Sequence, residues 1–168
     1  MNNKQNPGRR NAIQQMLMAT AGLSIFSLPS LAETKNTTAG GESLKPFMLS
    51  PMEALQPGPG GLDIRTWVRS SQTNMQYSCV EFAVAAKKMG PEPHYHKSLD
   101  ELMYVLEGTA TVMVEDTVYE VPAGGWHFRP RGIVHTFFNN SDKPFRGIDM
   151  YFNQNFEDYL EELFHKII

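Results

Sequence analysis

The chain has 168 residues, which is enough for one compact domain with short extensions but not for two separate cores. Its formal net charge is -3, and the body after residue 32 is more acidic still, because Lys4, Arg9 and Arg10 are the only charged residues before it. Such a body lacks the clustered Lys and Arg that phosphate backbones require, so no nucleic-acid partner is expected. A single cysteine, Cys79, excludes an internal disulfide, and its apolar neighbours predict a small buried side chain.

Residues 1–32 have the three-part layout of a secretory signal peptide. A basic start is followed by an apolar, small-residue stretch from Met16 to Leu28, and Ser30-Leu31-Ala32 resembles a signal peptidase site. The apolar stretch is shorter than the ~18 residues that a membrane-spanning helix needs, which makes a permanent anchor the weaker interpretation. We therefore expect a periplasmic or secreted protein with no membrane partner after cleavage.

The pair Arg9-Arg10 resembles a twin-arginine signal, which directs folded proteins to export. Residues 11–14 depart from the usual continuation of that signal, so the general export route remains an alternative. Residues 33–61 are rich in Thr, Asn, Gly and Pro, which predicts a linker and an N-terminal arm without helix or strand.

Residues 62–152 predict an all-β barrel or sandwich. Short runs rich in Val, Thr, Tyr and Phe alternate with turn signals such as Glu107-Gly108 and Pro130-Arg131-Gly132. The predicted strands are Asp63–Arg69, Tyr77–Ala86, Glu101–Leu106, Thr109–Glu115, Val118–Val121, Trp126–Arg129, His135–Asn139 and Phe145–Phe152. The first of these is a candidate edge strand, and pairing through it would give a homodimer.

Residues 153–168 predict one amphipathic α-helix that packs on the outside of the barrel. Apolar residues recur at helical spacing, and Asn155 is suited to cap the helix. These apolar positions are Phe156, Tyr159, Leu160, Leu163 and Phe164. His165, on the same segment, is expected at the surface.

Two segments carry candidate metal ligands. His94 and His96 are two residues apart, so a strand would direct both imidazoles to one face. Glu101 is at an odd offset and joins them only if the chain turns a corner between residues 97 and 100. His135 follows the turn at Pro130-Arg131-Gly132 and can reach the same inward point.

Three imidazoles and one carboxylate suit one divalent ion of Mn, Fe, Ni, Co or Zn, and the ligands alone do not select among them. On an octahedral ion, these four ligands would leave two positions for water, dioxygen or a chelating substrate. On zinc, the same four could instead complete a tetrahedral shell.

Both segments resemble the two motifs of the cupin superfamily. The first motif reads His-x-His, three or four residues, Glu, six residues, Gly, and fits His94, His96, Glu101 and Gly108. The second motif fits Gly124, Pro130, Gly132, His135 and Asn139 at every spacing. The one departure is Gly90, which lies four residues before the first histidine where family members often have six. The resemblance implies a cupin jelly-roll β-barrel with His94, His96, Glu101 and His135 as metal ligands.

Other residues are predicted to surround the metal. Met103, Val105, Met113, His127 and Phe137 are expected to line an apolar pocket for a small-molecule substrate. Arg129 and Arg131 are placed near its rim, either attracting an anionic substrate or simply solvated. Tyr95 is expected to point outward.

The sequence from Glu101 to Gly108 and the C-terminal Phe-Glu-x-Tyr-Leu segment resemble the quercetin-dioxygenase-like branch of the cupins. This resemblance implies a metal-dependent oxygenase acting on a small enolic or phenolic molecule, with Glu101 doubling as a catalytic base. Two alternatives remain open at this point: an oxygen-independent isomerase, hydrolase or lyase, and a non-catalytic periplasmic binding module.

Overall fold

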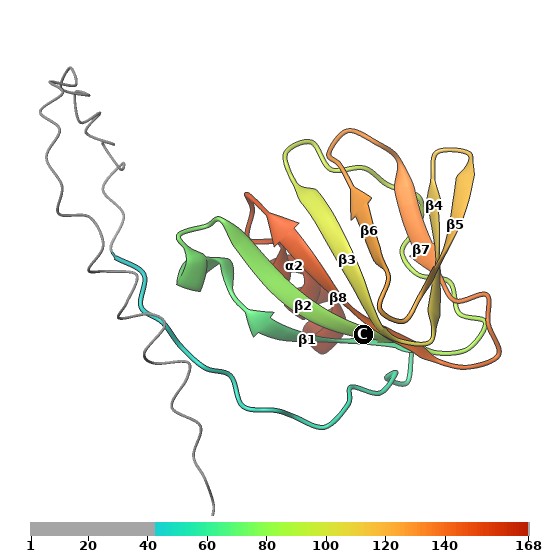
Figure 1. Cartoon of the computed structure of the whole chain (residues 1–168), viewed down its shortest axis with the longest axis horizontal. Coiled ribbons are helices and arrows are strands. Elements are labelled where there is room, and N and C mark those ends of the chain that lie inside the picture. Colours follow the sequence, from blue (N-terminus) through green and yellow to red (C-terminus); the bar gives the residue numbers. More distant parts are fainter. Residues whose placement is uncertain (1–42, 168) are drawn as a thin grey trace, which may run out of the picture. The chain divides into compact units, whose positions relative to one another are not determined.

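The computed structural model describes residues 43–167, so the predicted signal peptide and the first part of the linker lie outside the described residues. The described part forms two antiparallel sheets (Figure 1), with strand orders β1-β2-β8-β3-β6 and β5-β4-β7. The strands are β1 (Leu62–Val68), β2 (Tyr77–Val84), β3 (Asp100–Glu107), β4 (Thr109–Val114), β5 (Thr117–Pro122), β6 (Trp126–Arg129), β7 (His135–Phe138) and β8 (Phe145–Phe152). All eight predicted strands are present, which confirms the all-β jelly-roll prediction.

Strand β1 lies at one edge of the larger sheet, as expected, and pairs only with β2. The arm before it, from residue 43 to residue 61, contains no helix or strand, which agrees with the loop signals in its sequence. Among the described residues, no helix is long and apolar enough to cross a membrane.

Along strand β3, side chains alternate between the interior, where the candidate site lies, and the surface. Glu101, Met103 and Val105 are buried, whereas the residues between them are only half-buried. This period of two follows from the pleat of the strand, and it directs Glu101 into the space between the sheets.

An aromatic group joins the two sheets. Phe82 on β2 and Phe145 on β8 meet edge-on with ring centroids 5.7 Å apart, and Phe137 on β7 lies 5.1 Å from Phe82. Gly108, between β3 and β4, has φ +76°, and a Cβ there would lie 2.8 Å from Phe145 Cβ. Only glycine therefore lets the turn close over this part of the core.

The C-terminal segment begins as predicted but changes its helical form. Helix α2 (Phe156–Glu162) continues directly into a π-helical turn (η2, Leu163–Ile167), so the predicted C-terminal helix is present and widens in its last turn. Phe156, Leu160 and Phe164 pack against the core, as expected. In Figure 1, α2 lies over β2 and β8 of the larger sheet.

Polar contacts fix α2 to a 3-10 helix (η1, Ser70–Thr73) that the sequence pattern did not predict. Glu157, which is 2% exposed, accepts hydrogen bonds of 2.7 Å from both the backbone N–H and the hydroxyl of Ser70. Arg69 and Thr66 both donate to the Glu161 carboxylate, at 2.6 Å each for the shorter contacts. The helix is therefore held by polar contacts on one side and by apolar packing on the other.

The Glu157 contact predicts a pH-dependent stability. Burial alone would raise the pKa of Glu157, but the two Ser70 donors hold it below its ordinary value. Its stabilising effect is therefore complete above the ordinary carboxyl pKa and is lost as pH falls through the lowered value. We expect Glu157→Gln to reduce the free energy of unfolding by about 1 kcal/mol at neutral pH, with the deficit shrinking below about pH 4.

Urea unfolding of wild type and Glu157→Gln across this pH range measures the deficit. Glu162→Gln, on the exposed face of the same helix, is the matched control and should leave stability within about 0.5 kcal/mol. A Glu157→Gln deficit that stayed constant with pH would show that the carboxylate charge plays no part.

Candidate metal centre

His94 and His96 lie on an irregular segment between β2 and β3 rather than within a strand. His94 pairs with His135 through two backbone hydrogen bonds, N–H of each to the carbonyl of the other, at 3.0 and 2.8 Å. Gly90 makes this approach possible, because a Cβ at that position would lie 2.1 Å from the Phe137 carbonyl oxygen. The segment is thereby laid against the start of β7, which brings His94 beside His135.

The corner predicted between residues 97 and 100 is present. The chain bends there, Leu99 is completely buried, and β3 begins at Asp100. On the other side, the turn after Pro130 is tied to the same region, since Gly132 N–H donates to the His96 carbonyl at 2.7 Å. The segment around His96 and the turn after Pro130 are thus joined by backbone contacts that do not involve the side chains of the candidate ligands.

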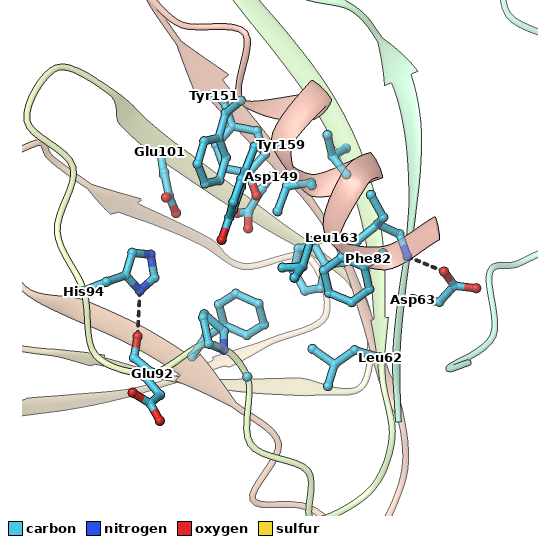
Figure 2. Close-up of a pocket in the computed structure, with 18 of the residues that line it drawn as sticks. Leu62, Asp63, Phe82, Glu92, His94, Glu101, Asp149, Tyr151, Tyr159 and Leu163 are labelled. Carbon is cyan, nitrogen blue, oxygen red and sulfur yellow. Dashed lines mark hydrogen bonds between the residues drawn. The ribbon is translucent and has the colours of Figure 1, made fainter. Parts of the chain in front are cut away.

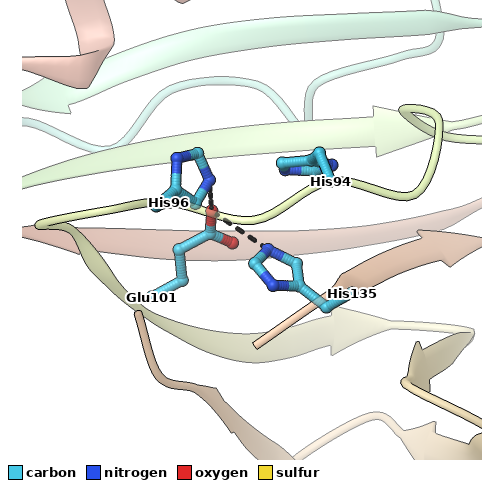
Figure 3. A group of neighbouring side chains, drawn as sticks. All are labelled: His94, His96, Glu101 and His135. Atoms are coloured by element: carbon cyan, nitrogen blue, oxygen red, sulfur yellow. Dashed lines mark ion pairs between the residues drawn. The ribbon is translucent and has the colours of Figure 1, made fainter. Parts of the chain in front are cut away.

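The four predicted ligands come together in one cluster. The candidate donor atoms of His94, His96, Glu101 and His135 all lie within 4.8 Å of one another. Glu101 Oε1 lies 2.6 Å from His96 Nε2 and 3.5 Å from His135 Nε2 (Figure 3). Glu101 and His135 are buried, at 3% and 1% exposure, and the other two are half-buried.

Backbone contacts prepare two of these imidazoles to bind a cation. Nδ1 of His94 lies 2.8 Å from the Glu92 carbonyl, and Nδ1 of His135 lies 2.9 Å from the Ile133 carbonyl. A carbonyl oxygen can only accept, so each Nδ1 carries the proton and each Nε2 presents a lone pair.

The same atoms show that a metal ion fits the cluster. Nε2 of His96 and Nε2 of His135 are buried without a hydrogen-bond partner of acceptable geometry. Buried polar atoms are normally paired. Two unpaired imidazole nitrogens beside one carboxylate therefore indicate that a cation binds to this cluster. Imidazole nitrogen and carboxylate oxygen are the donors that divalent transition metals bind in proteins.

Arg129 controls the charge of this cluster. It is 1% exposed and its Nη2 lies 2.9 Å from Glu101 Oε2. Burial alone would raise the pKa of Glu101, but the Arg129 guanidinium brings it well below its ordinary value. Glu101 is therefore an anion at neutral pH, as a metal ligand must be.

A second buried carboxylate, Asp149 on β8, shares the same guanidinium. Its pKa is raised to about 6, because burial and the charge of Glu101 outweigh the attraction of Arg129. Tyr151, two residues on along β8, lies opposite Glu101 in the strand register, and burial raises the pKa of its hydroxyl well above the ordinary value. The site thus holds two carboxylates with opposite pKa shifts.

A cavity of about 850 Å³ runs from this cluster to helix α2 (Figure 2). His94, His96, Glu101 and Asp149 line one part of it. The remaining wall is mostly apolar and comes from β1, β2, β7, α2 and η2, with Leu62, Ile64, Val80, Phe82, Phe137, Phe156, Leu160, Leu163 and Phe164. The exposed residues Lys88, Glu92 and Tyr159 also line the cavity, so it is open to solvent there.

Of the five predicted pocket residues, Phe137 alone lines this cavity. Met103 and Val105 point inward as expected, but they are fully buried in the hydrophobic core and do not line the cavity. Met113 alternates with Val112, which is in the core, and so lies on the opposite face of β4. His127 is half-buried with its ring 4.9 Å from that of Tyr119, away from the donor cluster.

The prediction that Arg129 lies near the rim was wrong, because its side chain turns inward between the sheets. Arg131 is exposed, and its guanidinium pairs with Asp100. Asp149, Tyr151 and the inward role of Arg129 were missed by the sequence analysis. The alternation of inward and outward side chains along β6 and β8 was the available signal. It identifies these residues only when the pairing of both strands with β3 is known. Tyr95 is exposed and His165 lies at the surface, as predicted; Cys79 is half-buried rather than fully buried.

Comparison with known proteins agrees with this geometry. Residues 80–151 match the cupin domain family, and the matched stretch contains all four candidate ligands. An uncharacterized protein of Aquifex aeolicus (strain VF5) is 34% identical over 55 residues, which are 33% of this chain and 46% of that protein. The match therefore spans less than half of the relative's own length.

Solved structures share the fold at low sequence identity. KdgF from a Halomonas species superposes with a TM-score of 0.52 and 17% identity, over 58% of this chain and 84% of that one. A predicted oxalate decarboxylase from Thermotoga maritima gives a TM-score of 0.50 and 14% identity, over 54% and 79% of the two chains. Together with the family match over residues 80–151, these likenesses support a cupin fold for the barrel.

Proposed function

We propose that this cupin is an exported, metal-dependent enzyme, an oxygenase that acts on a small enolic or phenolic molecule. The observation that carries the proposal is the position of the donor cluster, because His94, His96 and Glu101 line a largely apolar cavity. His94, His96, Glu101 and His135 would hold one divalent ion. When bound, the ion would supply Lewis acidity toward a substrate hydroxyl and, if it is redox-active, contact with dioxygen.

The charges along the cavity favour a neutral organic substrate over a small dianion. Glu101 and Asp149 place two acidic side chains in its wall, whereas Arg129 does not line it. Among the lining residues, the only lysine or arginine is Lys88, which is exposed. The apolar wall would pack against a ring or a hydrocarbon group. The name of the Thermotoga maritima protein, a predicted oxalate decarboxylase, therefore does not indicate the substrate of this chain.

The pKa shifts of the two carboxylates indicate which of them would accept the substrate proton. Glu101 was the predicted base, but its pKa is held well below its ordinary value, which makes it a weak proton acceptor. Asp149 lines the same cavity with a pKa raised to about 6, closer to the working pH of a general base. We therefore favour Asp149 as the group that receives the hydroxyl proton, with Glu101 kept as a ligand.

Oxygen uptake by the full chain tests the proposal. The protein would be loaded in turn with Fe²⁺, Mn²⁺, Ni²⁺, Co²⁺ and Zn²⁺, and supplied with catechol as a phenolic probe and acetylacetone as an enolic probe. Oxygen consumption in step with loss of a probe would support an oxygenase. Turnover without oxygen would instead indicate an isomerase, hydrolase or lyase, and tight binding without turnover would indicate a binding module.

The cavity also predicts which substitutions block binding. Leu160 lines the cavity from α2, so Leu160→Trp would fill part of it without touching the donor cluster. We expect at least a tenfold weaker binding of 4-nitrocatechol, about 1.4 kcal/mol, with an unchanged metal content. Spectral titration of the metal-loaded protein measures the affinity.

Glu162→Trp adds the same side chain on the exposed side of α2 and is the matched control. Its affinity for 4-nitrocatechol should stay within about twofold of wild type. Equal losses in both variants would show that the effect comes from the helix and not from the cavity.

Location is proposed from the sequence, and assembly from the order of strands in the larger sheet. A basic start, an apolar stretch and Ser30-Leu31-Ala32 favour export, and the edge position of β1 leaves its outer backbone groups free to pair with a second copy. Cell fractionation would test the first proposal, and light scattering at several protein concentrations would test the second.

A further inference from the structure

Arg129 is a buried guanidinium beside the candidate metal centre. It does not line the cavity, and no other lysine or arginine is buried among residues 43–167. A fully buried guanidinium carries a large desolvation cost and is retained only where its partners compensate it. The residues that pair with Arg129 therefore indicate what it does at the site.

The guanidinium divides the two oxygens of Glu101 between different partners. Nη2 of Arg129 lies 2.9 Å from Glu101 Oε2, while Oε1 lies 2.6 Å from His96 Nε2. The strand register supports this division, since Arg129 on β6 lies directly opposite Glu101 on β3. Oε2 is thereby engaged by the protein, and Oε1 is left facing the imidazoles.

Asp149 holds the guanidinium from the other side. The same Nη2 donates to Asp149 Oδ1, and Asp149 lies on β8, which pairs with the opposite edge of β3. The Arg129 side chain also packs over the Phe137 ring, with Cζ 5.6 Å from the centroid. Contacts from β8 and β7 thus fix the guanidinium, and the guanidinium in turn fixes the Glu101 carboxylate.

We infer that Arg129 is a positioning residue that holds Glu101 so that Oε1 is directed at the bound ion. The inference rests on the proposed metal-binding function and deepens it. Both polar contacts come from one nitrogen, Nη2, so the positioning depends on where the guanidinium holds that nitrogen over the Phe137 ring. A lysine side chain is shorter and lacks the guanidinium plane, and would hold its ammonium elsewhere. Outer partners that orient a ligand in this way typically change metal affinity about 10–100-fold.

Arg129→Lys in the full chain tests the inference, with Arg131→Lys as the matched control. Arg131 is exposed and bonds Asp100, one residue from Glu101, so the control makes the same chemical change nearby. Co²⁺ is the probe: its affinity is measured by competition with a chromophoric chelator, and its visible absorption spectrum reports the number and arrangement of its ligands. We expect Arg129→Lys to weaken Co²⁺ binding about 10–100-fold and to alter the spectrum, and Arg131→Lys to do neither.

Thermal unfolding of the metal-free proteins shows whether each variant folds. Arg129→Met joins the series as a second variant, and it should shift affinity and spectrum in the same direction. A folded Arg129→Lys with the wild-type affinity and spectrum would overturn the inference, as would equal losses in Arg131→Lys. Failure of the wild-type chain to bind Co²⁺ would instead overturn the metal-binding proposal itself.

Discussion

Replacing His96 and His135 together by alanine is expected to abolish metal binding while leaving a folded barrel. The double variant removes two of the four donors, and these are the two whose Nε2 atoms are buried without partners. Loss of a partner that only orients a ligand costs about 10–100-fold in affinity, so loss of two direct ligands should exceed that range. Elemental analysis should find one divalent ion per wild-type chain and none in the variant.

Metal-dependent stability provides a second readout of the same variant. At a free metal concentration of about 100 times the Kd, the wild-type free energy of unfolding should rise by about 2.7 kcal/mol, and that of the variant should not change. His165→Gln is the control, because His165 is exposed and outside the cluster. Metal retained by the double variant would mean that the ion binds elsewhere.

Phe145→Ala is expected to destabilise the fold by about 3–5 kcal/mol without changing the metal stoichiometry. Phe145 is 1% exposed and packs edge-on against Phe82, joining β8 to β2 beneath the turn at Gly108. Removing its ring leaves a void that the rigid strands cannot close. Urea unfolding of the metal-free protein measures the loss.

Phe128→Ala is the matched control for this core substitution. Phe128 is 54% exposed on β6, so its truncation should change stability by no more than about 0.5 kcal/mol. Similar losses for the two variants would contradict the view that the aromatic contacts of Phe82, Phe137 and Phe145 join the sheets.

The sequence was sufficient to predict the strands and the four donors. Strand periodicity, turn residues and the two motifs are local signals, and each donor is placed by a short stretch of chain. His94 and His96 were predicted from their spacing of two, although they lie on an irregular segment and not in a strand, and Glu101 was predicted from the corner before β3. The backbone bridge between His94 and His135 was not needed to predict that they meet, but it explains how they do.

The cavity could not be predicted in the same way. The alternation of side chains along β3 separates inward from outward residues, but it does not show which inward side chains line the cavity. Met103 and Val105 meet packed core, whereas Glu101 on the same face meets the cavity. The difference arises from the opposite wall, where α2 and η2 close over part of the sheet.

Arg129 illustrates the same limit for a charged residue. An arginine at the end of a short strand, just before Pro130, would ordinarily be solvated, and Arg129 was predicted at the rim of the pocket. Its buried position depends on two carboxylates that lie 28 residues before it and 20 residues after it, Glu101 and Asp149. Only the pairing of β6 and β8 with β3 brings them together.

A crystal structure of the full chain with Co²⁺, using anomalous diffraction recorded on both sides of the cobalt absorption edge, tests the metal centre most directly. We predict one strong anomalous peak per chain, in contact with the imidazoles of His94, His96 and His135 and with Glu101. A peak at any other place, or no peak at a Co²⁺ concentration well above that of the protein, would contradict a metal centre at this cluster.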